Sequence, residues 1–173
     1  MPIDLHLDPV PSDVATPARL GAAQNPPMLK ANLAGFERLL AHNRGTKIVW
    51  AHAGSDPLGY FTPTLVRELL GRHSNLALSV RPTSPWPGSM VHPTGDVSAE
   101  WVAVLRDFPD RFVLGSDTMI VAASYTGPPT PRLFAGRGEG QRRGIRRLLS
   151  VLPGDVARRI GYKNAERLYK LGR

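Results

Sequence analysis

Hydrophobic positions along this chain follow two alternating patterns, one typical of β-strands and one typical of α-helices. Short apolar runs of the kind that form β-strands occupy residues 3–7, 48–51, 76–80 and 112–114. After each run, apolar residues recur at every third or fourth position, which is typical of an amphipathic helix. Strand and helix alternate four times, and this alternation predicts one α/β domain, residues 1–173, with a parallel sheet and right-handed crossovers.

The helical period marks five segments: residues 28–42, 63–72, 98–108, 140–152 and 155 onward. Thr62 is an expected N-cap, because its hydroxyl can accept a hydrogen bond from the first turn and proline follows it. Ser98 is expected to start the next helix. Residues 9–27 contain several prolines and predict a long loop, which on a barrel would lie over the active-site face.

Three of the predicted strands lead into a side chain that binds metals or transfers protons. His6 lies in IDLHLDP, His52 in KIVWAHAGSD and Asp117 in FVLGSD. Because the carboxyl ends of parallel strands meet at one edge of a sheet, we expect these three side chains to converge. Taken singly, a histidine there is more often structural, and an aspartate after Gly-Ser is often a helix N-cap.

Arg81 follows the third predicted strand and is the fourth candidate site residue. A guanidinium binds a carboxylate through two parallel hydrogen bonds, so Arg81 is expected either to clamp a substrate carboxylate or to form a structural ion pair at the rim. The other histidines have weaker claims. His73 closes a helix and His92 lies in a loop, and both are expected on the surface.

The motifs DLHLD, W-x-HAG, VLGSD and NAERLY, in this order, resemble the second half of an amidohydrolase-superfamily barrel. The amidohydrolase-related group, which includes enzymes of the aminocarboxymuconate-semialdehyde decarboxylase type, is the most similar branch. The resemblance extends over nearly the whole chain. It implies a TIM barrel with one catalytic divalent metal, usually zinc, and hydrolysis of C–N or C–O bonds or decarboxylation of a small carboxylated substrate.

The resemblance also implies a role for each strand-end residue. His6 would bind the metal, His52 would polarise the substrate or shuttle protons, and Asp117 would bind the metal and activate water. The family's first strand carries a His-x-His pair of metal ligands, and no two of the five histidines in this chain are separated by one residue. An inactive remnant without metal is therefore the alternative.

The length of 173 residues suits one domain but is short for a complete TIM barrel of about 250 residues. The chain is therefore expected to form a half-barrel, the last four units of a TIM barrel with an extra C-terminal helix. Such a half-barrel would expose its two edge strands and the apolar side chains of its inner face. We expect a homodimer, or a partner chain with the missing half, to cover them, and weak zinc binding by the isolated chain.

Composition narrows the remaining alternatives. The absence of cysteine excludes disulfides and leaves histidines and carboxylates as metal ligands. No apolar run approaches the roughly 20 residues of a membrane span, and no secretory signal is recognisable, so a cytoplasmic protein is expected. The net charge of +8 is concentrated near residues 132–147. There, arginines form one face of a predicted helix without interleaved aromatic residues, which disfavours nucleic-acid binding.

Overall fold

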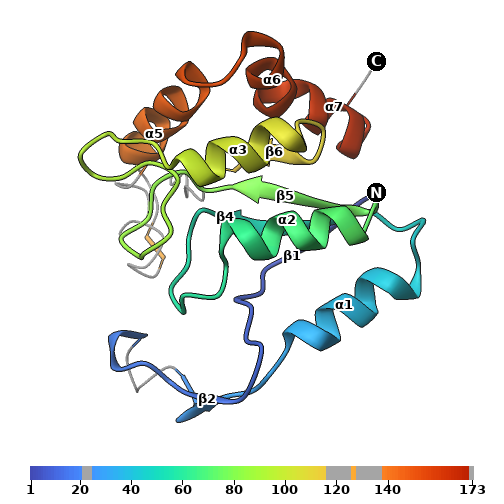
Figure 1. Ribbon diagram of the computed structural model, residues 1–173, viewed down its shortest axis with the longest axis vertical. Coiled ribbons are helices and arrows are strands. Elements are labelled where there is room, and N and C mark those ends of the chain that lie inside the picture. The colour runs from blue at the N-terminus through green and yellow to red at the C-terminus, as the bar shows by residue number, and fades with distance from the viewer. Residues whose placement is uncertain (21–24, 116–125, 128–137, 172–173) are drawn as a thin grey trace.

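A computed structural model describes residues 1–20, 25–115, 126–127 and 138–171 (Figure 1). Its centre is a sheet of four parallel strands in the order β1 (Ile3–Leu5), β4 (Ile48–Ala53), β5 (Leu76–Val80) and β6 (Phe112–Leu114). The predicted α/β class and the parallel sheet are confirmed. Two short strands, β2 (Val14–Ala15) and β3 (Met28–Leu29), pair antiparallel outside this sheet.

The helices lie mainly where the 3.6-residue period predicts them. They are η1, a 3-10 turn (Ala18–Leu20), α1 (Leu33–His42), α2 (Pro63–Arg72), α3 (Ala99–Asp107), α5 (Gly138–Ser150), α6 (Gly154–Arg158), the π-helical turn η2 (Arg159–Lys163) and α7 (Asn164–Tyr169). Thr62 Oγ1 accepts a hydrogen bond from Leu65 N at 3.2 Å, which confirms the predicted cap. In the described part of the chain, no helix combines the length and apolar character needed to cross a bilayer.

The first helix begins later than predicted. Met28 and Leu29 form β3 instead of helix, and α1 starts at Leu33. The reason lies in the preceding loop, because its residues 14–15 pair with 28–29 and hold them extended. Asn32 fastens the same loop: its Oδ1 accepts from Val10 N at 2.8 Å and its Nδ2 donates to Asp8 O at 2.9 Å.

His73 is buried, and its predicted surface position is wrong. Its side chain is 5% exposed, and its Nε2 lies 3.7 Å from Glu37 Oε2 on α1. The ring is enclosed because α1 lies beside it, and Asn75, just before β5, is also buried. Asn75 Nδ2 donates to the carbonyl oxygens of Leu40 and Thr46 at 3.0 and 3.1 Å.

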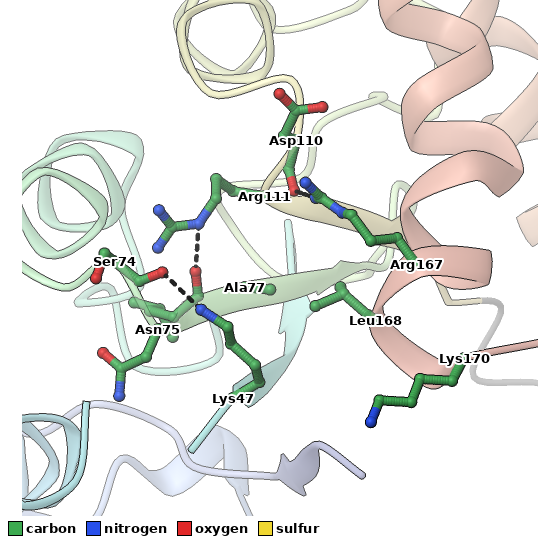
Figure 2. A pocket seen from close by; sticks show the side chains of 10 residues that line it. Lys47, Ser74, Asn75, Ala77, Asp110, Arg111, Arg167, Leu168 and Lys170 are labelled. Carbon is green, nitrogen blue, oxygen red and sulfur yellow. Dashed lines mark hydrogen bonds between the residues drawn. The ribbon is translucent and has the colours of Figure 1, made fainter. Parts of the chain in front are cut away.

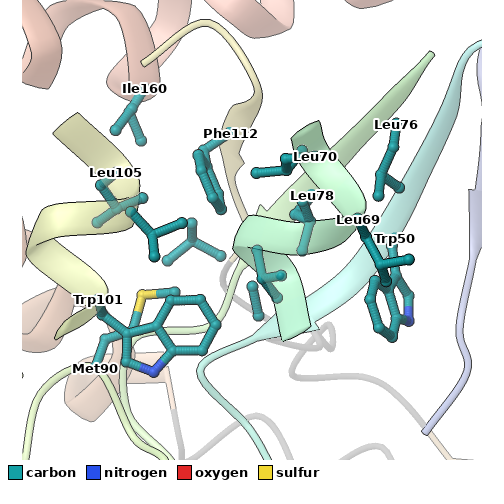
Figure 3. Close-up of a cluster of buried hydrophobic side chains, with 14 of the residues drawn as sticks. Trp50, Leu69, Leu70, Leu76, Leu78, Met90, Trp101, Leu105, Phe112 and Ile160 are labelled. Atoms are coloured by element: carbon teal, nitrogen blue, oxygen red, sulfur yellow. The ribbon is translucent and has the colours of Figure 1, made fainter. Parts of the chain in front are cut away.

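The main core fills the space between one face of the sheet and the helices (Figure 3). Alternate strand residues point into it: Ile48, Trp50, Leu76, Leu78, Val80 and Phe112. Trp50 stacks on Phe61 with ring centroids 4.0 Å apart, and its Nε1 donates to Leu7 O at 2.7 Å. This hydrogen bond joins the segment after β1 to the core, where a buried indole N–H requires a partner.

The other face of the sheet is also covered, so the prediction that it would be open is wrong at its centre. Val49, Ala77 and Val113 are only 1–3% exposed, and residues of α7 pack on them, chiefly Leu168. A short C-terminal helix thus supplies the apolar cover that a closed barrel would give. Tyr169 anchors it, because its hydroxyl donates to Asp4 Oδ1 at 2.8 Å. Burial and this hydrogen bond raise the pKa of Tyr169 to about 12.

We expect Leu168→Ala to lower the free energy of unfolding by about 2 kcal/mol, because it removes the apolar contact between α7 and the sheet. Leu171→Ala is the matched control, since that leucine is 66% exposed, and it should change stability by less than about 0.5 kcal/mol. Urea unfolding followed by tryptophan fluorescence measures both. Equal effects of the two substitutions would contradict the packing described here.

Candidate functional site

Two predicted site residues meet at the carboxyl edge of the sheet. His6 follows β1 directly, and His52 is the second-last residue of β4, the strand beside it. Their imidazole ring centroids lie 4.4 Å apart, with the ring planes inclined at 65°. His6 is exposed and His52 is half-buried. The convergence predicted for these two histidines is confirmed. Asp117, the third predicted member, lies outside the described residues.

The backbone at His52 departs from regular strand geometry. Its φ is +71°, in the left-handed region that residues other than glycine seldom adopt. The pairing of β4 with β5 also shifts register between Trp50 and Ala53. Gly54 continues the bend with φ +92°, and a Cβ there would lie 2.7 Å from Arg81 O. Strain of this kind is retained where the surrounding structure holds it, often at functional sites. Here it determines the position of the imidazole beside His6.

Two carboxylates near the histidines were missed in the sequence. Asp56 is 3% exposed, and its Oδ1 accepts hydrogen bonds from Gly59 N at 2.6 Å and Tyr60 N at 3.0 Å. Asp8 lies close enough to Asp56 for the charge of Asp56 to affect the pKa of Asp8. Burial raises the pKa of Asp8, a protonated His6 lowers it, and Asp56 raises it again. The available signal was position, because each aspartate follows a candidate histidine within the same short motif.

The fit of this edge to a metal is partial. Two imidazoles side by side are good ligands for zinc, which also needs further protein ligands. Among the residues that the structure describes, no three histidines, aspartates or glutamates are arranged to hold a metal ion. His6 and His52 would therefore supply two ligand positions at most, and Asp117 is the residue that the sequence offers for a third.

Arg81 follows β5 at the same edge, where its backbone N donates to Ala53 O at 2.8 Å. Its side chain lines a pocket of about 820 Å³ between the loop after β5 and α5. Arg143, Arg147 and His92 line the pocket as well, and none of the lining residues in the described part of the chain carries a carboxylate. The pocket therefore attracts an anionic ligand, and its volume lies in the range of small-molecule sites.

Helix α5 forms one wall of this pocket through specific contacts. Gln141 Nε2 donates to Thr83 O at 2.7 Å, and Arg147 Nε donates to Gly95 O at 2.9 Å. Gly144 permits the close approach, because a Cβ there would lie 2.4 Å from Thr83 Cγ2. The cationic helix predicted to be a solvated face thus also contributes two arginines to the pocket.

No family model, curated protein or solved structure matches this chain. The resemblance to the amidohydrolase-related group therefore depends on the short ordered motifs, and the geometry above stands without a relative to interpret it.

We expect the pKa of Asp8 to lie above its ordinary value of 3.8, which carboxyl-carbon NMR titration measures directly. The protonated form of Asp8 then stabilises the fold below about pH 3.8, and this contribution is lost as the pH rises through the folded-state pKa. His6→Ala should raise the pKa of Asp8 further, because the variant removes a charge that lowers it. Asp56→Asn should lower it.

Asp13 is the internal control for this titration. Its carboxylate accepts hydrogen bonds from Lys30 Nζ at 2.8 Å and from Ala31 N at 2.9 Å, and these hold its pKa below the ordinary value. Neither His6→Ala nor Asp56→Asn should move it. A pKa of Asp8 that both variants leave unchanged would separate Asp8 from the site.

Proposed function

We propose that this chain is a metal-dependent hydrolase or decarboxylase that acts on a small carboxylated substrate, with a site of the amidohydrolase-related kind. The observation that carries the proposal is the His6–His52 pair, with ring centroids 4.4 Å apart at the ends of neighbouring parallel strands. The two histidines are distant in sequence and lie side by side at the carboxyl ends of the strands, where α/β folds place their active sites. This position favours a catalytic role for them over a structural one.

In this proposal His6 and Asp117 hold the metal, which is zinc by the resemblance. Zinc, when bound, lowers the pKa of its water to about 7 and polarises a carbonyl or carboxylate oxygen. His52 transfers a proton to or from the substrate, and its half-buried ring is accessible for this. Asp117 takes the proton of the water that attacks. Arg81 binds the substrate carboxylate from the anion-attracting pocket beside the site.

We further propose that the sheet corresponds to four consecutive units of a TIM barrel. Its parallel strands in sequential order support this proposal. The packing of α7 on the face that would line the barrel is a difference from a closed barrel. Because α7 already covers that face, a second copy or a separate chain would add metal ligands beside the exposed His6 instead of apolar cover.

The alternative is an inactive remnant that keeps the sheet and has lost the metal. One observation favours it: the described residues hold no group of three metal ligands. The two functions differ in one measurable property, because only the enzyme requires His6 to bind a metal.

We expect zinc to bind the purified chain weakly, with a dissociation constant of about 10 µM or higher, because part of the ligand set is missing. His6→Ala should reduce this binding at least tenfold in calorimetry. His42→Ala is the control, since that exposed histidine ends α1 away from the site, and it should have no effect. Zinc binding that none of the variants alters would favour the remnant.

Activity is tested with zinc present on a nitrophenyl ester that carries a free carboxylate. The enzyme proposal expects hydrolysis that His52→Ala abolishes and that Arg81→Gln impairs through KM rather than kcat, because Arg81 binds the substrate away from the reacting bond. Release of CO₂ from small carboxylic acids tests the decarboxylase form. Absence of both activities in the zinc-loaded chain would exclude the self-sufficient enzyme.

A further inference from the structure

A second pocket, of about 310 Å³, lies at the opposite edge of the sheet from His6 and His52 (Figure 2). It is formed where β4, β5 and β6 begin and where α7 crosses the sheet. Leu76, Ala77 and Leu168 line it with apolar surface. The candidate catalytic residues take no part in it, so its chemistry is independent of the proposed function.

Cations dominate the polar lining of this pocket. Four basic side chains line it: Lys47, Arg111, Arg167 and Lys170. Among the described lining residues, Asp110 alone carries a carboxylate, and Arg159 binds it with Nη1 at 3.2 Å from Oδ1 and 3.0 Å from Oδ2. Arg159 lies outside the lining and compensates the charge of Asp110. The four basic side chains of the lining are therefore left with an excess of positive charge.

Backbone carbonyls hold two of these cations in place. Arg111 donates through Nε to Leu76 O at 2.6 Å, and Arg167 donates through Nη2 to Asp110 O (Figure 2). Arg111 Nη2 also donates to His73 O. Lys47 Nζ reaches Ser74 O at 3.4 Å. Neutral carbonyls orient a guanidinium but do not neutralise it, so among the described lining residues the positive charges exceed the negative ones.

The electrostatic cost of this arrangement is visible at Arg111. Its side chain is half-buried, and the pKa of its guanidinium is lowered by burial and by the charge of Arg167. A fold that serves structure alone does not need to gather cations around a half-buried arginine. An anion in the pocket would compensate them, and it would bind in a setting partly screened from water.

We propose that this pocket binds a small molecule that carries a phosphate group, with the phosphate between Lys47 and Arg111 and any apolar portion against Leu76, Ala77 and Leu168. A dianion suits the excess of positive charge better than a monocarboxylate. The volume admits a phosphate with a short organic group rather than a polymer.

The test is titration of the full chain with inorganic phosphate, glycerol phosphate and acetate, followed by amide NMR. We expect shifts confined to residues 47, 74–77, 110–111 and 167–170, and tighter binding of both phosphates than of acetate. Lys47→Ala combined with Lys170→Ala should weaken phosphate binding about tenfold, because two exposed cations are lost while the carbonyl-bound arginines stay. Arg111 is left unchanged because its hydrogen bonds to β5 support the fold.

Arg106→Ala combined with Arg146→Ala is the matched control. It removes the same charge from exposed positions on α3 and α5 outside the pocket and should leave phosphate affinity within twofold. Equal weakening by both double variants would mean general electrostatic attraction and overturn the proposal. Three other results would also overturn the proposal: shifts centred on the pocket beside Arg81, equal affinity for acetate and phosphate, or no shift at about 20 mM phosphate. A dissociation constant above about 20 mM is too weak to count as specific binding.

Discussion

Burial of the sheet on both faces is the constraint on which the rest of this structure depends. Parallel strands carry apolar side chains on each side and are stable only when both sides are covered. Helices α2 and α3 pack on one face and α7 on the other. This arrangement brings the carboxyl ends of β1 and β4 together, and with them His6 and His52. The same packing of α7 creates the cationic pocket at the opposite edge.

Amide side chains make this compact arrangement compatible with its loops. A buried backbone carbonyl without a partner costs free energy comparable to a lost hydrogen bond. Asn164, at the start of α7, donates through Nδ2 to Pro109 O at 2.8 Å and to Phe112 O at 2.7 Å. Asn75 satisfies carbonyls at the end of α1 and in the connection from α1 to β4, and Gln141 satisfies one in the loop after β5. These contacts to distant carbonyls have no periodic signal, which is why sequence reasoning did not assign them to Asn164, Asn75 and Gln141.

The strands and most helices were predictable because their signals are local. Residues 76–80 and 112–114 form strands with the predicted bounds, and the Thr62 cap is a hydrogen bond between neighbours in sequence. The errors arose where distant segments decide the outcome. Met28 is extended because residue 15 pairs with it, and His73 is buried because α1 lies beside it. No period within a single segment contains that information.

The candidate site was predictable to the same extent. The juxtaposition of His6 and His52 follows from strand order, since parallel neighbours share an edge. The raised pKa of Asp8 does not follow, because it reflects burial and the charge of Asp56 beyond the strand ends. The left-handed backbone at His52 was equally hidden, although Gly54 two residues later indicates a bend.

The hydrogen bond between Tyr169 and Asp4 spans nearly the entire chain and has a consequence for biogenesis. Among the described residues, α7 covers the second face of the sheet, so this cover cannot form before residues 164–169 are synthesised. Val49, Ala77 and Val113 all precede α7 by 50 residues or more and are translated well before it. Contacts between segments so distant in sequence slow folding and prolong the lifetime of aggregation-prone intermediates. Chaperone contact during synthesis would therefore concentrate on the nascent sheet before α7 emerges.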